Sequence, residues 1–448
     1  MITSVLIANR GEIALRVART CRELGLRTIA VYTTADADSA VVRFADEAIR
    51  IGSGPAKSSY LHIPAIIEAA RMSGADAIHP GYGFLSEDPD FAEVCAAEGI
   101  IFIGCPAKVM SELGDKARAR AIMVDAGLPL LPGSRDPITD PDEAAEFAAE
   151  IGYPVIVKAV AGGGGRGMAV VSDPAEFPAA YARTRATALA VFGDGRLYVE
   201  RYLESARHVE IQVLADQEGT VVHLGARDCS LQRRHQKLVE EAPAPALPAD
   251  VLANLGAMAV RGATAAGYVG AGTFEFLLDP TDHSFYFMEV NCRLQVEHPV
   301  TEMVTGIDLV HEQIRIAAGE PLGYTQADIV SRGVALECRI NAEDPARDFA
   351  PTPGELTEFE LPGGPFVRVD THARLGYRVP PLYDSLLAKV VVWAPDRPTA
   401  IARMRRALAE LRMGGPAVST TAEFLDGLLD HPRFRAVRHD TAMIAGLT

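Results

Sequence analysis

Residues 5–32 read VLIANRGEIALRVARTCRELGLRTIAVY, and this stretch identifies the architecture of the amino-terminal part of the chain. Its two ends, residues 5–8 and 28–32, are short apolar runs of the length expected for buried strands. Between them, apolar side chains recur at helical spacing at positions 13, 17, 21 and 24, and Gly25 ends the pattern. The stretch therefore predicts a strand, a helix and a second, parallel strand.

The same alternation continues to about residue 103, with runs over 64–71, 75–79, 91–97 and 100–103. We therefore expect an amino-terminal doubly wound parallel sheet with helices on both faces. The first turn, residues 9–12, reads NRGE and lacks the G-x-G-x-x-G pattern of dinucleotide-binding folds. A hydride-transfer enzyme is thereby disfavoured.

The rest of the chain predicts two further units, so that the whole combines α/β and α+β parts. Prolines and Gly133 interrupt the first pattern over residues 128–133, and a helical stretch over 141–150 leads into the apolar run 155–158. Strands dominate from residue 197, and residues 208–213, HVEIQV, alternate so that His208, Glu210 and Gln212 share one face. After Gly319 and Pro321, short strands and Pro/Gly turns predict a mainly β carboxyl-terminal domain.

Composition excludes several classes of protein. With 43 basic and 59 acidic residues the net charge is -16, which argues against a nucleic-acid partner bound by bulk positive charge. The sequence contains no run of about 18 apolar residues, so it predicts no membrane span. The apolar run 5–8 is too short for a secretory signal. The 6 cysteines form no C-x-x-C pair and are expected to be mostly buried thiols. We expect a cytoplasmic protein.

The glycine run over residues 162–167, GGGGRG, follows an apolar strand-like run. Glycines let backbone N–H groups approach a phosphate, although a glycine run alone is equally typical of a flexible hairpin turn. Lys158 favours the phosphate interpretation, because a lysine on a buried strand needs a compensating anion. No Lys-Ser or Lys-Thr follows the glycines, so the stretch is not a P-loop.

Two strand-like segments, 273–276 and 287–291, place polar oxygens among bulky apolar neighbours. If these strands pair, Glu275, Glu289 and Asn291 can form a cluster of hard oxygen ligands suited to Mg²⁺ together with substrate phosphates. The alternative is that they are the polar outer face of an amphipathic sheet.

Residues 291–299, NCRLQVEHP, are dense in functional groups for a connecting segment. An arginine fork such as Arg293 can hold a planar oxyanion, and a nearby carboxylate can accept a proton from it. Bicarbonate, carboxylates and phosphate all fit this description. Residues 233–237, RRHQK, form a second cationic cluster, and Glu240 and Glu241 beside it favour a local anion site over a nucleic-acid patch.

Taken together, these motifs resemble the biotin carboxylases of the ATP-grasp superfamily. The similarity extends along essentially the whole chain, through residues 7–14 (IANRGEIA), 79–87 (HPGYGFLSE), 114–116 (GDK), the glycine run, 207–212 (RHVEIQ), 240–245 (EEAPAP), 291–302 and 337–345 (ECRINAEDP). The resemblance implies an amino-terminal domain over residues 1–113, an ATP-grasp domain over 114–330 with a mobile lid over about 131–203, and a carboxyl-terminal domain over 331–448.

The resemblance also implies roles for individual residues. Those expected to bind ATP are Lys116, Lys158, Gly163, Gly164, Gly165, Glu200, Arg201, Tyr202, Leu203, His208, Gln232, His235, Glu275, Leu277 and Glu289. Glu275, Glu289 and Asn291 are expected to hold Mg²⁺ or Mn²⁺. The bicarbonate site is expected to comprise Lys237, Arg293, Gln295 and Val296, with Glu297 as general base. Arg339 is expected to face the biotin ureido oxygen, with Tyr82 nearby.

The implied reaction is ATP-dependent carboxylation of biotin by bicarbonate through carboxyphosphate, a ligase reaction that forms a carbon–nitrogen bond. No Ala-Met-Lys-Met motif occurs, so biotin is expected on a separate carrier protein. Further expected partners are a carboxyltransferase subunit and, in a homodimer, a second copy of the chain. Acetyl-CoA carboxylase in fatty acid synthesis is the leading holoenzyme, and propionyl-CoA or another acyl-CoA carboxylase is the alternative. The competing hypotheses are a different ATP-grasp carboxylate ligase and an inactive regulatory subunit.

Overall fold

The amino-terminal strands form the parallel sheet that the sequence predicts. The computed structural model describes residues 1–134, 136–161 and 167–447. Its first sheet has five parallel strands in the order β3-β2-β1-β4-β5. The elements are β1 (Ser4–Ile7), α1 (Gly11–Glu23), β2 (Arg27–Thr33), α2 (Ala40–Phe44), β3 (Glu47–Gly52), α3 (Ile63–Ser73), β4 (Ala77–His79), α4 (Pro89–Ala97) and β5 (Ile101–Phe102).

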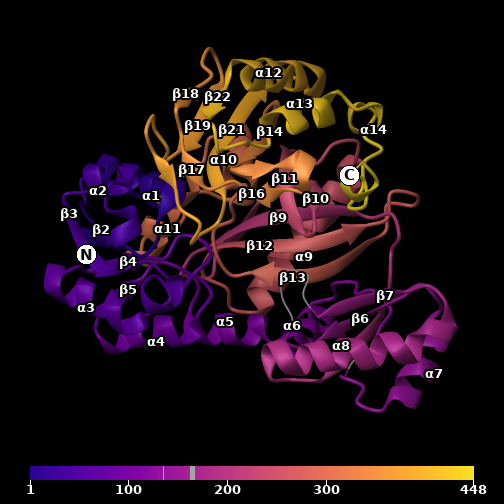
Figure 1. Cartoon of the computed structure of the whole chain (residues 1–448). Helices are drawn as coiled ribbons and strands as arrows, with labels where there is room; N and C mark the ends of the chain where they lie inside the picture. The colour runs from indigo at the N-terminus through magenta and orange to yellow at the C-terminus, as the bar shows by residue number, and fades with distance from the viewer. Residues whose placement is uncertain (135, 162–166, 448) are drawn as a thin grey trace.

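Alternate side chains of β1 show why helices cover both faces of this sheet. Val5 and Ile7 pack in one cluster with Ile13 of α1, whereas Leu6 packs on the other face with Ile66 of α3. Because successive strand residues point to opposite faces, a strand that is apolar throughout needs cover on both. The predicted doubly wound arrangement is therefore confirmed (Figure 1).

The largest sheet is antiparallel and has eight strands in the order β13-β12-β9-β10-β11-β14-β21-β19. These strands are β9 (Arg207–Ala215), β10 (Val221–Arg233), β11 (Gln236–Ala242), β12 (Gly270–Leu278), β13 (Phe285–Asn291), β14 (Val334–Asn341), β19 (Val367–Thr371) and β21 (Leu386–Ala394). Strand β11 pairs with β14, with Val239 opposite Cys338. The sheet thus continues from the central part of the chain into the carboxyl-terminal part.

Helices and short strands complete these two parts. The helices are α5 (Ala107–Gly114), α6 (Lys116–Asp125), α9 (Ala249–Ala265), α10 (His298–Thr305), α11 (Leu309–Ala317), α12 (Arg397–Glu410), α13 (Ala422–Asp430) and α14 (Pro432–Arg435). The short strands are β15 (Glu343–Asp344), β16 (Ala350–Pro351), β17 (Gly354–Glu355), β18 (Glu358–Glu360), β20 (Arg378–Val379) and β22 (Arg412–Gly414). The mixed α/β architecture with an antiparallel carboxyl-terminal sheet agrees with the predicted fold class.

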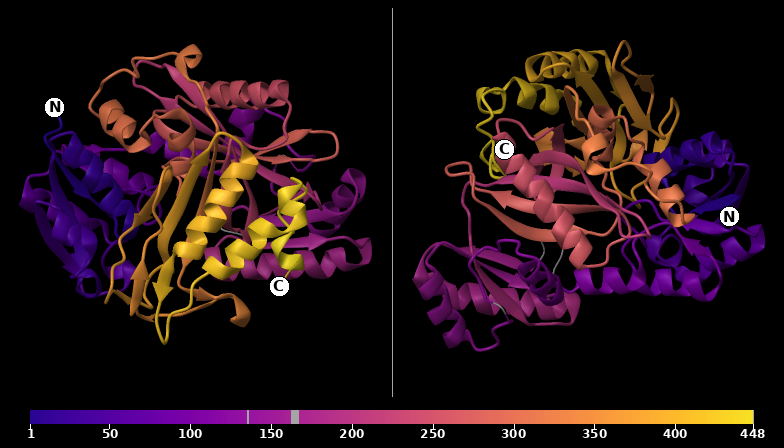
Figure 2. Two further views of the ribbon diagram at one scale, coloured as in Figure 1. Left: turned by 90° about the horizontal axis from the view of Figure 1, so that it is seen from above. Right: turned by 180° about the vertical axis from the view of Figure 1, so that it is seen from behind.

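Residues 131–203, which the sequence predicts as a lid, contain a separate small sheet. It has three antiparallel strands in the order β7-β6-β8, namely β6 (Val155–Ala159), β7 (Met168–Val171) and β8 (Leu197–Arg201), covered by α7 (Pro141–Ile151) and α8 (Phe177–Phe192). Val157, Phe177 and Val199 belong to an apolar core of its own. Figures 1 and 2 show this unit at the end of the molecule opposite the amino-terminal sheet.

Strand β9 has one apolar face and one polar face, as predicted, and both are buried. Val209 and Ile211 pack into the core beneath the sheet with Leu255 of α9. His208 and Glu210 point to the opposite side, where polar side chains of the neighbouring strands meet them. This inward polar face is the floor on which the candidate site is built.

Two predictions from composition can be compared with the structure. All six cysteines are buried and free, as expected for reduced thiols. Among the described residues, no helix combines the length and apolar character needed to cross a membrane.

Candidate active site

A cavity of about 1330 Å³ lies where the amino-terminal turn, the lid strands, the large sheet and the carboxyl-terminal segment meet. Among the predicted site residues, it is lined by Tyr82, Lys116, Lys158, Glu200, Arg201, Tyr202, Leu203, His208, Gln232, His235, Lys237, Glu275, Leu277, Glu289, Asn291, Arg293, Gln295, Val296 and Arg339. Glu297 is fully buried directly behind this wall. Gly163, Gly164 and Gly165 lie outside the described residues.

Strand register explains the acidic centre of the cavity. Glu275 of β12 is directly opposite Glu289 of β13 and directly opposite Glu210 of β9, whose other cross-strand neighbour is Arg227 of β10. Directly opposed like charges destabilise a sheet unless cations offset them. Here Arg227 Nε lies 2.5 Å from Glu210, and the ammonium of Lys237 contacts both Glu210 and Glu275.

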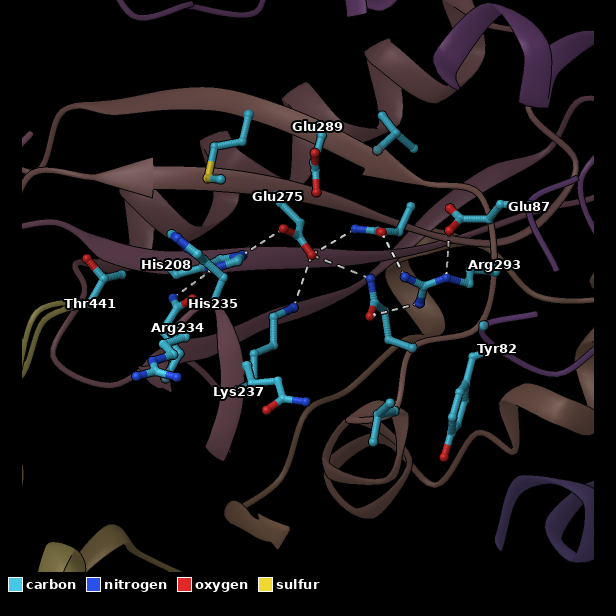
Figure 3. A pocket seen from close by; sticks show the side chains of 18 of the residues that line it. Tyr82, Glu87, His208, Arg234, His235, Lys237, Glu275, Glu289, Arg293 and Thr441 are labelled. Carbon is cyan, nitrogen blue, oxygen red and sulfur yellow. Dashed lines mark hydrogen bonds and ion pairs between the residues drawn. The ribbon is translucent and has the colours of Figure 1, made fainter. Parts of the chain in front are cut away.

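Glu275, Glu289 and Asn291 come together as the strand pairing requires. Asn291 Nδ2 donates to Glu275 Oε1 at 2.8 Å, and His208 Nε2 lies 3.0 Å from Glu275 Oε2 (Figure 3). Since Glu275 is buried and faces the cavity, the alternative of a polar outer sheet face is wrong for this residue. Glu289 is more exposed and faces the open cavity, where partial desolvation and the neighbouring Glu275 charge raise its pKa. A divalent cation would offset this repulsion, so the oxygen donor set fits Mg²⁺ or Mn²⁺.

Glu297 is held by two cations from two different strands. Lys237 Nζ of β11 lies 2.6 Å from Glu297 Oε1, and Arg339 Nη2 of β14 lies 2.8 Å from Glu297 Oε2. Burial opposes ionisation of this carboxyl, but Lys237, Arg339 and Arg227 together hold its pKa well below its ordinary value. The carboxylate is therefore ionised at neutral pH.

Arg293 gathers acceptors from two parts of the chain. Its guanidinium donates to Glu87 Oε2 at 2.8 Å, to Asn291 Oδ1 at 3.0 Å and to Gln295 Oε1 at 3.1 Å (Figure 3). Tyr82 lines the same wall, but its hydroxyl donates to Glu12 and is turned away from the Glu275 cluster.

Lys158 differs from the sequence expectation. Its side chain is 23% exposed instead of fully buried, and an anion already faces it: Glu200 Oε2 lies 2.5 Å from Lys158 Nζ. The register explains this pair, because β8 places Glu200 opposite Ile156, two residues before Lys158 on the same face of β6. Arg120 Nη1 holds the other oxygen of Glu200 at 2.5 Å. A phosphate would therefore be an additional anion here.

The remaining predicted nucleotide-site residues also line the cavity. Lys116 is the first residue of α6, and burial lowers its pKa. Gln232 Nε2 lies 3.4 Å from His208 Nδ1, and His235 lies in the tight β10–β11 turn with φ of 67°. Arg201 is the last residue of β8, Tyr202 and Leu203 follow it, and Leu277 of β12 lines the same cavity.

Sequence reasoning missed several residues of the site. Glu87 and Glu240 hold Arg293 and Arg339, and Glu210 holds Lys237. The alternation of β9 marked Glu210, but no local pattern indicates which cation a carboxylate meets from a distant strand. Thr441 and Ala442 of the carboxyl-terminal segment also line the cavity, and such small side chains carry no sequence signal.

Comparison with known proteins assigns the family. Sequence models match residues 1–110 (biotin carboxylase, N-terminal domain), 115–325 (carbamoyl-phosphate synthase L chain, ATP binding domain) and 337–446 (biotin carboxylase C-terminal domain). A biotin carboxylase of Nostoc sp. is 53% identical over 96% of both chains. One subunit of the pyruvate carboxylase of Methanothermobacter thermautotrophicus is 51% identical over 97% of this chain and 88% of its own.

Solved structures agree with this assignment. A Campylobacter jejuni biotin carboxylase in complex with a β,γ-ATP compound has a TM-score of 0.96 at 48% identity, covering 100% of this chain and 99% of the other. The biotin carboxylase domain dimer of Hydrogenobacter thermophilus 2-oxoglutarate carboxylase, with MgADP, ADP and bicarbonate, has a TM-score of 0.95 at 47% identity, covering 100% and 98%. The chain therefore belongs to the biotin carboxylase family.

Proposed function

We propose that this chain carboxylates biotin on a separate carrier protein, using ATP and bicarbonate, as the first half-reaction of an acyl-CoA carboxylase. As a member of its family it is an ATP-dependent ligase that uses Mg²⁺ and biotin. The observation that carries the proposal is the meeting of Lys237 and Arg339 on one buried carboxylate, Glu297.

In the proposed first step Lys116 and Lys158 hold the ATP phosphates, and the lid closes over them. Lys237, Arg293 and Gln295 hold bicarbonate beside Val296. Glu297 takes the bicarbonate proton, and the bicarbonate oxygen attacks the γ-phosphorus. The bond from that phosphorus to the β,γ-bridging oxygen breaks, so that ADP leaves and carboxyphosphate forms. Mg²⁺ held by Glu275, Glu289 and Asn291 would neutralise negative charge on the phosphates.

The ion pairs of Glu297 make its basicity depend on the substrate. With its two cations in place the carboxylate is a weak base, since both stabilise its charged form. Bicarbonate that accepts hydrogen bonds from Lys237 competes for the same ammonium. Because Glu297 then shares Lys237 with bicarbonate, its proton affinity rises when bicarbonate is bound and the bicarbonate proton has to be removed.

In the proposed second step carboxyphosphate releases CO₂ next to biotin. The departing phosphate removes the ureido N–H proton, Arg339 stabilises the enolate-like ureido oxygen, and the ureido nitrogen attacks CO₂ to form carboxybiotin. Arg339 is already fixed in the cavity wall, because Glu240 accepts from its Nε at 2.6 Å and Glu297 accepts from its Nη2 at 2.8 Å.

For the holoenzyme we propose acetyl-CoA carboxylase first and another acyl-CoA carboxylase second. The proposed partners, in the cytoplasm, are a carrier protein and a carboxyltransferase subunit. A homodimer is proposed as well, and the dimeric Hydrogenobacter thermophilus domain supports it. Relatives that are parts of pyruvate and 2-oxoglutarate carboxylases broaden the range of final acceptors to be assayed.

The test is ADP release by the purified chain with Mg²⁺, ATP and bicarbonate, with and without free biotin. The proposal requires stimulation that needs both biotin and bicarbonate. If free biotin has no effect, the assay is repeated with a biotinylated carrier protein. Failure with both acceptors, with ATP still bound, would overturn the proposed substrate.

A further inference from the structure

Lys389 of β21 is a buried cation that the proposed reaction does not use. Its side chain is 0% exposed. Its ammonium donates to the Val296 carbonyl oxygen at 2.9 Å, lies 3.0 Å from Glu12 Oε1 and lies 4.0 Å from Asp370 Oδ2. Burying an ammonium is costly even when it is paired, so its presence here calls for an explanation beyond packing.

The strand register places Lys389 beside Arg339. The two residues are directly opposite each other on β21 and β14, so their side chains leave the same face of the sheet. Both reach consecutive residues of one segment: Arg339 holds the Glu297 carboxylate, and Lys389 holds the Val296 carbonyl. The segment is thus fixed at the side chain and at the backbone by neighbouring strands.

The Val296 carbonyl is the atom through which Lys389 can orient Glu297. That carbonyl, the Glu297 N–H and the Glu297 Cα lie in one rigid peptide plane, so fixing the carbonyl fixes the position of the Cα from which the Glu297 side chain extends. Helix α10 begins at the next residue, and Glu297, its N-cap residue, makes no side-chain capping hydrogen bond. Its carboxylate is left for Lys237 and Arg339.

Glu12 extends the arrangement to the amino-terminal part of the chain. Its Oε1 atom meets Lys389 and also accepts from the Tyr82 hydroxyl, and Tyr82 lines the cavity. The Lys389 ammonium therefore connects Glu12 at the start of α1, Val296 of the central part and its own carboxyl-terminal strand. These three segments form one wall of the cavity.

We propose that Lys389 is a positioning residue for the bicarbonate step, which holds the Val296–Glu297 peptide so that Glu297 faces the bicarbonate proton. This inference rests on the proposed function. It assigns to Lys389 no contact with substrate and no proton transfer of its own.

The experiment compares Lys389→Met with Arg397→Met in the full-length chain. Arg397, in the same carboxyl-terminal part as Lys389, is a matched control, because its Nε lies 2.8 Å from buried Glu241 of β11 and neither residue lines the cavity. Both substitutions remove a cation and leave a buried carboxylate without it. For Lys389→Met we expect kcat/KM for bicarbonate to fall about 100-fold, the usual cost of a misplaced reacting group. The Kd for ATP, measured by calorimetry, should stay near the wild-type value.

A purely structural role would give a different result. In that case Lys389→Met would lower the melting temperature and the bicarbonate turnover only as much as Arg397→Met does. Alternatively, it would weaken ATP binding by as much as it lowers bicarbonate turnover. Either result overturns the proposal. If Lys389→Met does not fold, Glu12→Gln tests the same contact. It removes the negative charge that pairs with the Lys389 ammonium and keeps a side-chain oxygen that can accept a hydrogen bond from it. It should show a smaller loss of kcat/KM for bicarbonate with ATP binding intact, and unchanged bicarbonate kinetics would overturn the proposal. Lack of biotin- and bicarbonate-dependent turnover in the wild-type chain would instead refute the proposed function.

Discussion

The two ends of the cavity balance their charges in different ways. At the end proposed for bicarbonate, Glu297 lies fully buried between Lys237 and Arg339, and each of these cations has at least one further carboxylate partner. At the end proposed for nucleotide, one carboxylate, Glu200, faces the two cations Lys158 and Arg120. At the first end the protein's own carboxylates already pair both cations, whereas the second end keeps a surplus of positive charge for phosphates.

This difference separates two ways of binding an anion. A site already filled with internal ion pairs has its groups fixed before the substrate arrives, so its substitutions should alter the rate of the chemical step. A site with surplus charge gains from the substrate's own charge, so its substitutions should alter affinity. The following predictions test this separation, beginning with the largest expected effect.

Glu297→Gln should cause the largest loss of activity among the substitutions at the bicarbonate end. It keeps the side-chain shape and removes the proton acceptor, so bicarbonate-dependent ADP release should fall by roughly 10²–10⁴-fold. The Kd for ATP should change little, because Glu297 lies behind the bicarbonate wall. Wild-type turnover in steady-state assays would contradict the assigned base.

Arg339→Met should separate the two half-steps at that end. Carboxylation of free biotin should fall by about 10²–10³-fold, the usual cost of a lost oxyanion donor. ATP cleavage with bicarbonate alone should fall less, and its pH profile should move upward, since Arg339 helps to hold down the pKa of Glu297. Equal losses in both assays would show that the arginine serves the first step alone.

Lys158→Met, at the nucleotide end, should lower the affinity for ATP. Loss of a charge-assisted contact to phosphate should raise the KM for ATP about 10-fold or more, with the KM for bicarbonate unchanged. Arg120→Met is the matched control, because it removes the other partner of Glu200. A rise in the KM for bicarbonate alone would remove the distinction between the two ends.

The smallest effect concerns stability near the first end. Burial raises the pKa of Glu240 to about 7, with Arg339 opposing the shift. A carboxyl that binds its proton more tightly in the folded chain stabilises it fully below the ordinary pKa of about 4.5, and this stabilisation is lost as pH rises through about 7.

Glu240→Gln lacks this titration. Its stability relative to wild type should therefore increase between about pH 5 and pH 8, by about 3 kcal/mol at most. Melting curves of both proteins at the two pH values measure the difference. Parallel curves would show that Glu240 stays ionised throughout.

Sequence reasoning recovered most of what local patterns encode. Period-two alternation identified the polar face of β9, and the apolar runs over residues 5–32 identified the parallel sheet. The expected meeting of Glu275, Glu289 and Asn291 follows from the same rule once β12 and β13 pair. The roles of the site residues came from the family resemblance, and they stay predictions.

What the sequence did not predict depends on contacts between distant segments. The Lys158 and Glu200 pair is set by the register of β6 and β8, and nothing near Lys158 in the chain indicates it. The Lys389 contact with Val296 likewise needs α10 and β21 to be placed by tertiary packing. The pairing of β11 with β14 joins two predicted domains in one sheet, because hydrogen bonding along an open strand edge is independent of the side-chain pattern.

That shared sheet has a consequence during synthesis on the ribosome. Strand β11 ends at Ala242, and its partner β14 begins at Val334, so the edge of β11 waits roughly 5–20 s at ordinary translation rates. Through this interval the backbone donors beside Lys237 are open to any other extended chain. A message truncated before β14 would thus yield a nascent chain with an unpaired, aggregation-prone strand edge at its future active site. Binding by a chaperone would be needed most at that stage.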